Sequence, residues 1–240
     1  MPHDLRILVF KHMSCQNPGI FRDYAPDRKV KFEEIDLYRG DSIPDIRNFD
    51  ALWVMGGSMN VWEEEEFPWL KQEKQAIREV HDRGMPFFGV CLGHQLLADA
   101  LGGTATPSAQ AEIGSFSIQP TFEGAKHRLL EGIPQGVQWA NVHTVEVTTP
   151  PENATILARS HDCPNHAMAV GDHAYSVQFH PEVCKSTMSG WLSIPGITPK
   201  IIDLLGEKGF HEFTHAIEIN RRHTEKAAAR LFDNWLSLVF

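Results

Sequence analysis

A cysteine between two glycines stands at a point where an apolar strand is expected to end and a helix to begin. Residues 89–93 are Gly-Val-Cys-Leu-Gly, after an apolar run at 86–90 and at the start of a helix expected over 92–101. This G-x-C-x-G pattern is typical of a nucleophile elbow with sulfur in place of oxygen. The positive end of the helix would favour the thiolate of Cys91, and the Leu92 N–H would donate to a developing oxyanion.

The two glycines of this motif have a physical reason. A tight strand-to-helix turn forces its central residue into a strained backbone conformation, and side chains at the flanking positions would clash. The strain directs the thiol out of the carboxyl edge of a parallel sheet, where open α/β folds bind their ligands. By itself the motif is equally compatible with a buried cysteine in an ordinary turn, so a catalytic role for Cys91 needs a base.

A histidine and a carboxylate two residues apart provide such a base. His180 follows a strand-like run over residues 174–179, and Glu182 comes after an intervening proline. Glu182 can accept a hydrogen bond from one imidazole nitrogen, which leaves the other nitrogen free to face Cys91. The chain has 13 histidines, and a lone histidine at a strand end is more often structural. The interpretation therefore depends on the elbow and the carboxylate together.

The two motifs together resemble those of the class I, or triad, glutamine amidotransferase family. Residues 89–95 (GVCLGHQ) are similar to its nucleophile motif and residues 179–182 (FHPE) to its His/Glu motif, in the same order. The resemblance covers roughly residues 5–182 and fits a stand-alone glutaminase domain of the guanylate-synthetase type. It implies a flavodoxin-like fold whose Cys91, His180 and Glu182 hydrolyse the glutamine side-chain amide through a thioester, with no metal or organic cofactor.

The resemblance also implies further residues around a bound glutamine. The Gly57 N–H would be the second oxyanion donor, and Gln95 would touch the glutamine. Residues 112–114 and the stretch around His143 are similar to segments near the glutamine pocket, so His143 is expected to bind substrate. Relatives often have His-Gly-Asp where this chain has His-Thr-Val, and Asn-Gln-Ala where it has His166 at the centre. These departures leave the identity of the substrate open.

The rest of the chain is expected to position these residues on a doubly wound, mostly parallel α/β sheet. Strand and helix alternate over the first hundred residues, as in a parallel sheet with crossover helices. We expect one domain over residues 1–240, with a core at 1–182 that holds the triad and a helical extension at 183–240. Strands are expected at residues 5–10, 30–35, 50–55, 86–90, 113–119, 137–139, 144–148, 156–158 and 174–179, and helices at 68–82, 92–101, 199–205 and 213–238.

Composition and charge argue against several classes of protein. Hydrophobic residues make up 42% of the 240 residues, enough for a large buried core, and the net charge of -9 disfavours nucleic acid as a partner. The apolar runs are too short to cross a membrane, and the start of the chain has no secretory signal, so a cytoplasmic location is expected. The four cysteines are scattered, without the C-x-x-C pairs of a zinc ribbon.

Several functions other than a glutaminase stay open at this point. The chain could pass ammonia to a separate synthase partner, or cleave γ-glutamyl peptides on its own. It could also be a binding module that kept the fold, or a hydrolase or chaperone with an elbow cysteine and other partners. Residues 211–215 match H-E-x-x-H, so His211 and His215 could hold a catalytic zinc, although no third ligand stands at a recognised spacing. The long C-terminal helix permits a homodimer.

Overall fold

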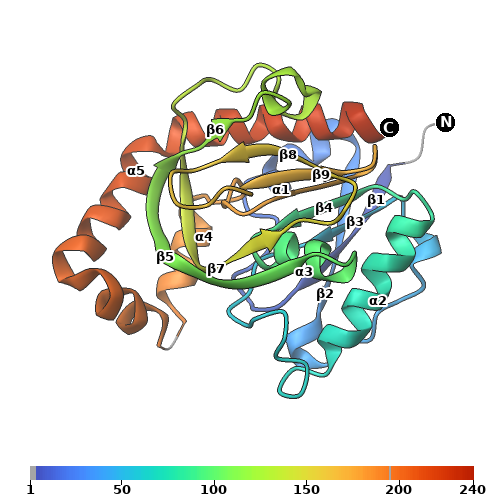
Figure 1. Cartoon of the computed structure of the whole chain (residues 1–240), viewed down its shortest axis with the longest axis horizontal. Coiled ribbons are helices and arrows are strands. Elements are labelled where there is room, and N and C mark those ends of the chain that lie inside the picture. The colour runs from blue at the N-terminus through green and yellow to red at the C-terminus, as the bar shows by residue number, and fades with distance from the viewer. Residues whose placement is uncertain (1–3, 195) are drawn as a thin grey trace.

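A mostly parallel sheet forms the centre of the structure (Figure 1). The computed structural model describes residues 4–194 and 196–240. Counted from the β2 edge in the spatial order given next, the first five strands are mutually parallel, and the strand pairs beyond them are antiparallel. In spatial order the strands are β2 (Val30–Asp36), β1 (Leu5–Lys11), β3 (Ala51–Val54), β4 (Phe87–Val90), β10 (Ala174–Val177), β9 (Ala167–Val170), β8 (Ala154–Arg159) and β6 (Gln119–Pro120).

The sheet is buried on both faces because apolar residues run continuously along its central strands. In β1, Ile7 and Val9 enter the core on one side, whereas Leu8 and Phe10 enter the core on the other. Such continuous runs are typical of parallel strands that helices cover on both sides. The doubly wound, flavodoxin-like α/β architecture expected from the sequence is confirmed.

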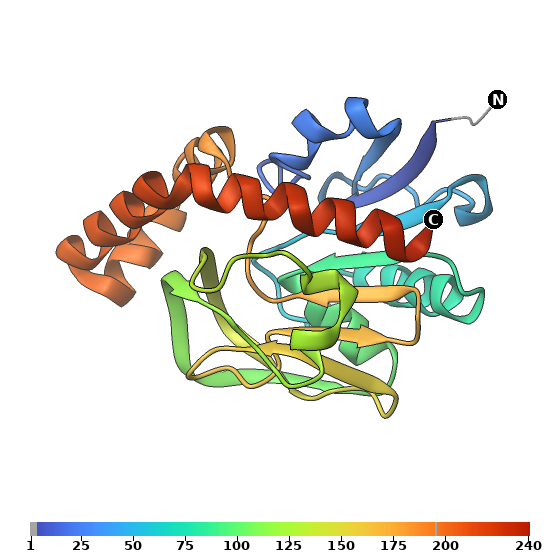
Figure 2. The ribbon, with the colours of Figure 1, turned by 90° about the horizontal axis from the view of Figure 1, so that it is seen from above.

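Helices cover the two faces unequally. Side chains of α2 (Trp69–Asp82) and α3 (Leu92–Ala100) pack on one face. The short α1 (Phe21–Tyr24) and the second part of α5 (Ile197–Val239) cover the other, where α5 runs across the molecule (Figure 2). The remaining α-helix is α4 (Lys185–Leu192), and short 3-10 turns lie at Pro26–Arg28, Leu37–Arg39, Ile46–Asn48, Gly124–Lys126 and Arg128–Leu130.

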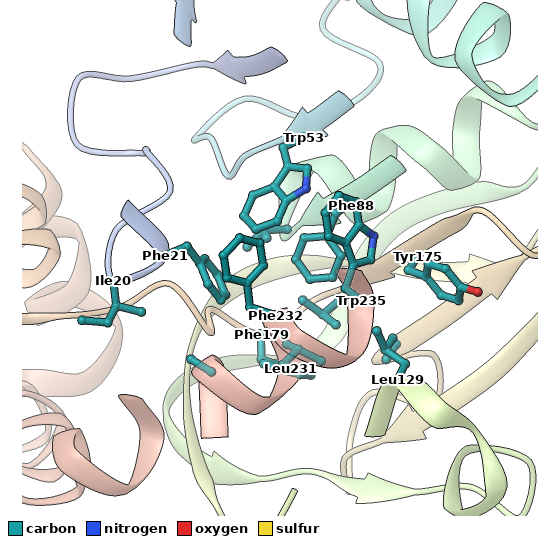
Figure 3. Packing of buried hydrophobic residues seen from close by; sticks show 14 of the residues in the cluster. Ile20, Phe21, Trp53, Phe88, Leu129, Tyr175, Phe179, Leu231, Phe232 and Trp235 are labelled. Atoms are coloured by element: carbon teal, nitrogen blue, oxygen red, sulfur yellow. The ribbon is translucent and has the colours of Figure 1, made fainter. Parts of the chain in front are cut away.

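The C-terminal helix is part of the main core rather than an appendage. Trp53 of β3 lies 5.5 Å from the Phe232 ring and 5.3 Å from the Trp235 ring, measured between ring centroids. Phe21 and Phe88 also belong to this aromatic cluster, with centroids 5.2 and 5.0 Å from that of Trp53 (Figure 3). Edge-to-face and tilted contacts of this kind stabilise beyond the burial of apolar area.

A two-stranded antiparallel ribbon stands beside the main sheet. It consists of β5 (Thr104–Ser117) and β7 (Gln138–Thr149), so the separate strands expected at 137–139 and 144–148 are wrong. The two segments form one strand because the residues between them also pair with β5, Asn141 with Gly114 and His143 with Glu112. Both are buried polar residues, which interrupt the apolar pattern in the sequence. The strand expected at 113–119 likewise begins earlier, at Thr104.

The elements α1, α4 and β9 had no counterpart in the sequence analysis. Of these, α1 has only four residues, β9 is a run of four buried residues, and the serine, threonine and glycine content of α4 hides its helical pattern. The helices expected at 199–205 and 213–238 both lie within α5, whose backbone is non-helical at Gly206, with φ 70° and ψ 166°, so that two helices meet there at a kink. None of the helices in the described residues combines the length and apolarity needed to span a membrane.

Candidate active site

Cys91 lies at a strained turn between β4 and α3. Its φ of 53° and ψ of -104° are values that only glycine adopts easily. A Cβ atom at Gly89 would lie 2.6 Å from the Gly93 carbonyl oxygen, and one at Gly93 would lie 2.1 Å from the Val54 carbonyl oxygen. Both glycines are therefore required by close backbone approach. The Cys91 N–H donates to the Val177 carbonyl at 2.9 Å, which ties the turn to β10.

His180 follows β10 and is fixed from several sides. Its backbone N–H donates to the Ala140 carbonyl of β7 at 2.9 Å. Its ring packs edge-on against Trp191, with ring centroids 4.8 Å apart. The Glu182 Oε1 atom lies 2.7 Å from the His180 Nδ1 atom, and both side chains are almost fully buried. The backbone of Glu182 is fixed as well, because its carbonyl accepts a hydrogen bond from the Ile20 N–H at 3.0 Å.

The electrostatics of this group favour a charged imidazole. Burial alone would disfavour the imidazolium, but Glu182 and Cys91 both attract it and raise the pKa of His180 to about 10. Cys91 and His180 line one hollow, and Glu182 contacts the far side of the His180 ring. The three residues that the sequence analysis singled out thus come together at one edge of the sheet.

Two hollows meet at Cys91. The smaller, of about 100 Å³, is lined by Cys91 and His180 and by apolar side chains of α4, α5 and the segment between them. The larger, of about 220 Å³, also contains Cys91 and extends to Gln95 and His143. Gly57 lines both hollows, so its loop lies between them. A Cβ atom at Gly57 would lie 2.7 Å from the Leu92 side chain, which shows how closely this loop approaches the start of α3.

The loop at Gly56 and Gly57 is supported by a buried pair that the sequence analysis missed. His12 Nδ1 lies 2.9 Å from the Gly56 carbonyl oxygen, and its Nε2 lies 2.9 Å from Glu73 Oε1. Burial works against a charged His12, but Glu73 outweighs it and raises the pKa of the ring. The signal was an acidic residue on the apolar side of α2, in line with Leu70 and Ile77.

Gln95 and His143 line the larger hollow, and each has a protein partner. Gln95 Nε2 donates to the Val145 carbonyl at 2.9 Å and to Gln178 Oε1 at 3.1 Å. His143 Nε2 lies 3.0 Å from Glu112 Oε2, an atom that is also 2.8 Å from His166 Nε2. Burial acts against ionisation of Glu112, yet the hydrogen bonds from the two imidazoles lower its pKa.

The H-E-x-x-H segment lies on α5, apart from these residues. His211 and His215 are both exposed on the surface of that helix. Within residues 4–194 and 196–240, the one group of three side chains close enough to hold a metal ion does not include either histidine. A third ligand for a zinc hydrolase at this place is thus absent from the described residues.

Comparisons with known proteins agree with this fold. Residues 27–192 match the family model "Glutamine amidotransferase class-I". The chain is 30% identical over 193 residues to a glutamine amidotransferase-like protein, YfeJ, of Salmonella typhimurium, covering 78% of this chain and 79% of that protein. It is 34% identical over 146 residues to a glutamine-hydrolyzing GMP synthase subunit of Sulfurisphaera tokodaii, covering 60% of this chain and 73% of the relative.

A solved structure is similar over nearly its whole length. A glutamine amidotransferase from Thermotoga maritima superposes with a TM-score of 0.84 at 25% identity, covering 99% of both chains. The fold and these relatives define an amidotransferase or hydrolase. The chain belongs to the class I glutamine amidotransferase family.

Replacing Glu182 with glutamine tests the electrostatics of this group. Because the variant removes the negative charge behind the ring, we expect the pKa of His180 to fall from about 10 toward the ordinary value of about 6.5. NMR titration of the histidine-labelled protein measures this shift, and Glu207→Gln, at an exposed position of α5, is the matched control. Equal titration of His180 in both variants would contradict the assignment.

The same change should alter stability in a pH-dependent way. The folded-state pKa of His180 lies above its unfolded value, so its contribution is fully present below about pH 6.5 and is lost as pH rises through about 10. The stability difference between wild type and Glu182→Gln, measured by urea unfolding, should therefore shrink between these two pH values.

Proposed function

We propose that this protein hydrolyses the side-chain amide of glutamine, with Cys91 as nucleophile, His180 as acid and base, and Glu182 as the residue that orients the imidazole. The observation that carries the proposal is the shared hollow of Cys91 and His180, with Glu182 2.7 Å behind the ring. A thiolate paired with an imidazolium needs no further activation to attack a carbonyl.

The first half of the reaction forms a thioester. The Cys91 sulfur attacks the carboxamide carbon, and the carbonyl electron pair moves onto oxygen. The N–H groups of Gly57 and Leu92 are proposed to hold this oxyanion, since one lines the hollow and the other begins α3 directly after the nucleophile. When the intermediate collapses, the C–N bond breaks and the His180 imidazolium gives its proton to the departing nitrogen, which leaves as ammonia.

The second half releases glutamate. His180, now neutral, takes a proton from water, and the water oxygen attacks the thioester carbon. The C–S bond then breaks, which returns the Cys91 thiolate and the His180 imidazolium and frees the acid. Gln95 and His143, on the walls of the larger hollow, are proposed to bind the glutamine. None of these steps uses a metal or an organic cofactor.

Ammonia from this reaction could serve a separate synthase. The Sulfurisphaera relative is named as one subunit of a GMP synthase, and a GMP synthase of Aliivibrio fischeri is 38% identical over 142 residues, a match that covers 26% of that longer protein. We propose a synthase partner by this likeness. Slow release of ammonia by the protein alone, with acceleration by a partner chain, would support it.

The variant Cys91→Ala tests the proposed chemistry. We expect glutaminase activity to fall at least about 10³-fold, because the nucleophile is lost while the fold is kept. Ammonia release from glutamine is measured in wild type, Cys91→Ala and the control Cys163→Ala, which removes a buried thiol that lies outside both hollows. Undiminished activity in Cys91→Ala, or equal loss in the control, would contradict the proposal.

A second candidate function, γ-glutamyl peptide hydrolysis, is favoured by the apolar wall beside the nucleophile. Trp191, Ile194, Ile197 and Ile201 face the smaller hollow together with Cys91 and His180. Departing ammonia needs no apolar wall, whereas an apolar amine or amino acid on the leaving side would bury its surface there. The same attack and proton transfers would then release an amine in place of ammonia.

Substrate preference distinguishes the two candidates. If the wall binds a leaving group, wild type should prefer γ-glutamyl-phenylalanine to glutamine by at least about tenfold in kcat/KM. The variant Ile194→Ser should reduce that preference, whereas Ile219→Ser, on an exposed part of α5, should leave the ratio unchanged. A wild-type preference for glutamine would reject the peptidase.

A further inference from the structure

Three buried side chains converge on one point next to the larger hollow. Glu112 of β5 and His143 of β7 are cross-strand partners in the ribbon, and His166 directly precedes β9 of the main sheet. The Nε2 atoms of both imidazoles face the same carboxylate oxygen, at 3.0 and 2.8 Å. The three candidate ligand atoms lie within 4.8 Å of one another. Two segments far apart in the chain thus present a compact set of nitrogen and oxygen donors.

No fixed positive charge among the described residues balances the carboxylate of this group. In the described part of the chain, Glu112 forms no ion pair with a lysine or arginine, and its partners are the two imidazoles. The Nδ1 atoms of His143 and His166 are buried and unpartnered. A buried carboxylate without a cation is costly, and a bound cation is a common solution.

We propose that Glu112, His143 and His166 form a binding site for a divalent transition-metal ion of the zinc class. Two imidazole nitrogens and one carboxylate oxygen are a donor set that zinc adopts in proteins, and imidazole disfavours magnesium and calcium. The site is separate from Cys91, His180 and Glu182, and it does not rest on the proposed function.

The distances fit an ion after the side chains move by about an ångström. At a metal–ligand distance of about 2.1 Å and tetrahedral angles, two ligand atoms of one ion lie about 3.4 Å apart. The distances from Glu112 to the two imidazoles, 3.0 and 2.8 Å, would therefore widen by about half an ångström, and the distance between the two Nε2 atoms, at most 4.8 Å, would close by up to about 1.4 Å. Each neutral imidazole now donates its Nε2–H to Glu112. On metal binding, Nε2 gives up this proton and Nδ1 carries one instead. The Nε2 lone pair is then free to bind the metal, and the charge of the two rings does not change.

Such an ion would couple the ribbon to the sheet. Glu112 and His143 belong to β5 and β7, whereas His166 leads into β9, so the metal would add to the hydrogen bonds that already link the two layers, such as that from the His180 backbone N–H to the Ala140 carbonyl. His143 also lines the larger hollow with Cys91 and Gln95, which gives the ion a route from solvent and places it against the proposed substrate pocket. Metal occupancy should therefore raise thermal stability.

Zinc binding to the full chain tests the proposal. After chelator treatment and addition of zinc sulfate, we expect about one tightly held zinc per chain by elemental analysis, and a Tm that rises with zinc. Glu112→Gln and His166→Gln should each weaken zinc affinity about 100-fold, measured by calorimetric titration, and remove the Tm rise. His211→Gln, at an exposed histidine of the H-E-x-x-H segment, should bind as wild type does.

Three results would overturn the proposal. They are the absence of tight zinc binding in wild type, unchanged binding in His166→Gln, and loss of binding in His211→Gln or Cys91→Ser. Loss of zinc binding in His211→Gln would place the metal on the surface of α5, and loss in Cys91→Ser would place it at the nucleophile. Circular dichroism of each variant shows that it is folded, so a failure to fold is not mistaken for a lost ligand. Because every readout is metal binding or Tm, the outcome is independent of whether glutamine is the substrate.

Discussion

Backbone crowding at the Cys91 turn is the constraint on which the candidate active site depends. Gly93 lies so close to the Val54 carbonyl of β3 that no side chain fits, and the Cys91 N–H is bonded to Val177 of β10. The turn is thus held by the strands on both sides of β4. A residue at φ 53° persists only where its surroundings determine it, and here they direct the sulfur to the carboxyl edge of the sheet.

The partner of the cysteine is fixed by a different part of the molecule. His180 is bonded through its backbone to β7 and packed against Trp191 of α4, while Glu182 binds the far side of its ring. The ribbon and the C-terminal helices, which lie outside the central sheet, therefore complete the site. They also bring the apolar side chains that line the smaller hollow beside Cys91 and His180.

Much of this arrangement could be predicted from the sequence because short motifs encode local geometry. The G-x-C-x-G turn and the His180–Glu182 pair are local patterns, and strand order brings them together once the sheet is parallel. Long-range polar contacts were harder to predict. Glu73 beneath the Gly57 loop, and Glu112 between two histidines, are recognisable only when distant segments meet, since nothing at short spacing marks them. For the same reason, the sequence analysis divided β7 into two strands: its continuous pairing with β5 is visible only in the structure.

Trapping the acyl-enzyme would test the central claim, that the sulfur of Cys91 forms a bond to the substrate carbonyl. Protein mixed with a γ-glutamyl amide and quenched in acid after a few milliseconds can be digested and examined by mass spectrometry. The account predicts a γ-glutamyl group on the peptide that contains Cys91, removable by hydroxylamine as expected of a thioester. Turnover of the substrate with an unmodified Cys91 peptide, or with the group on another residue, would contradict it.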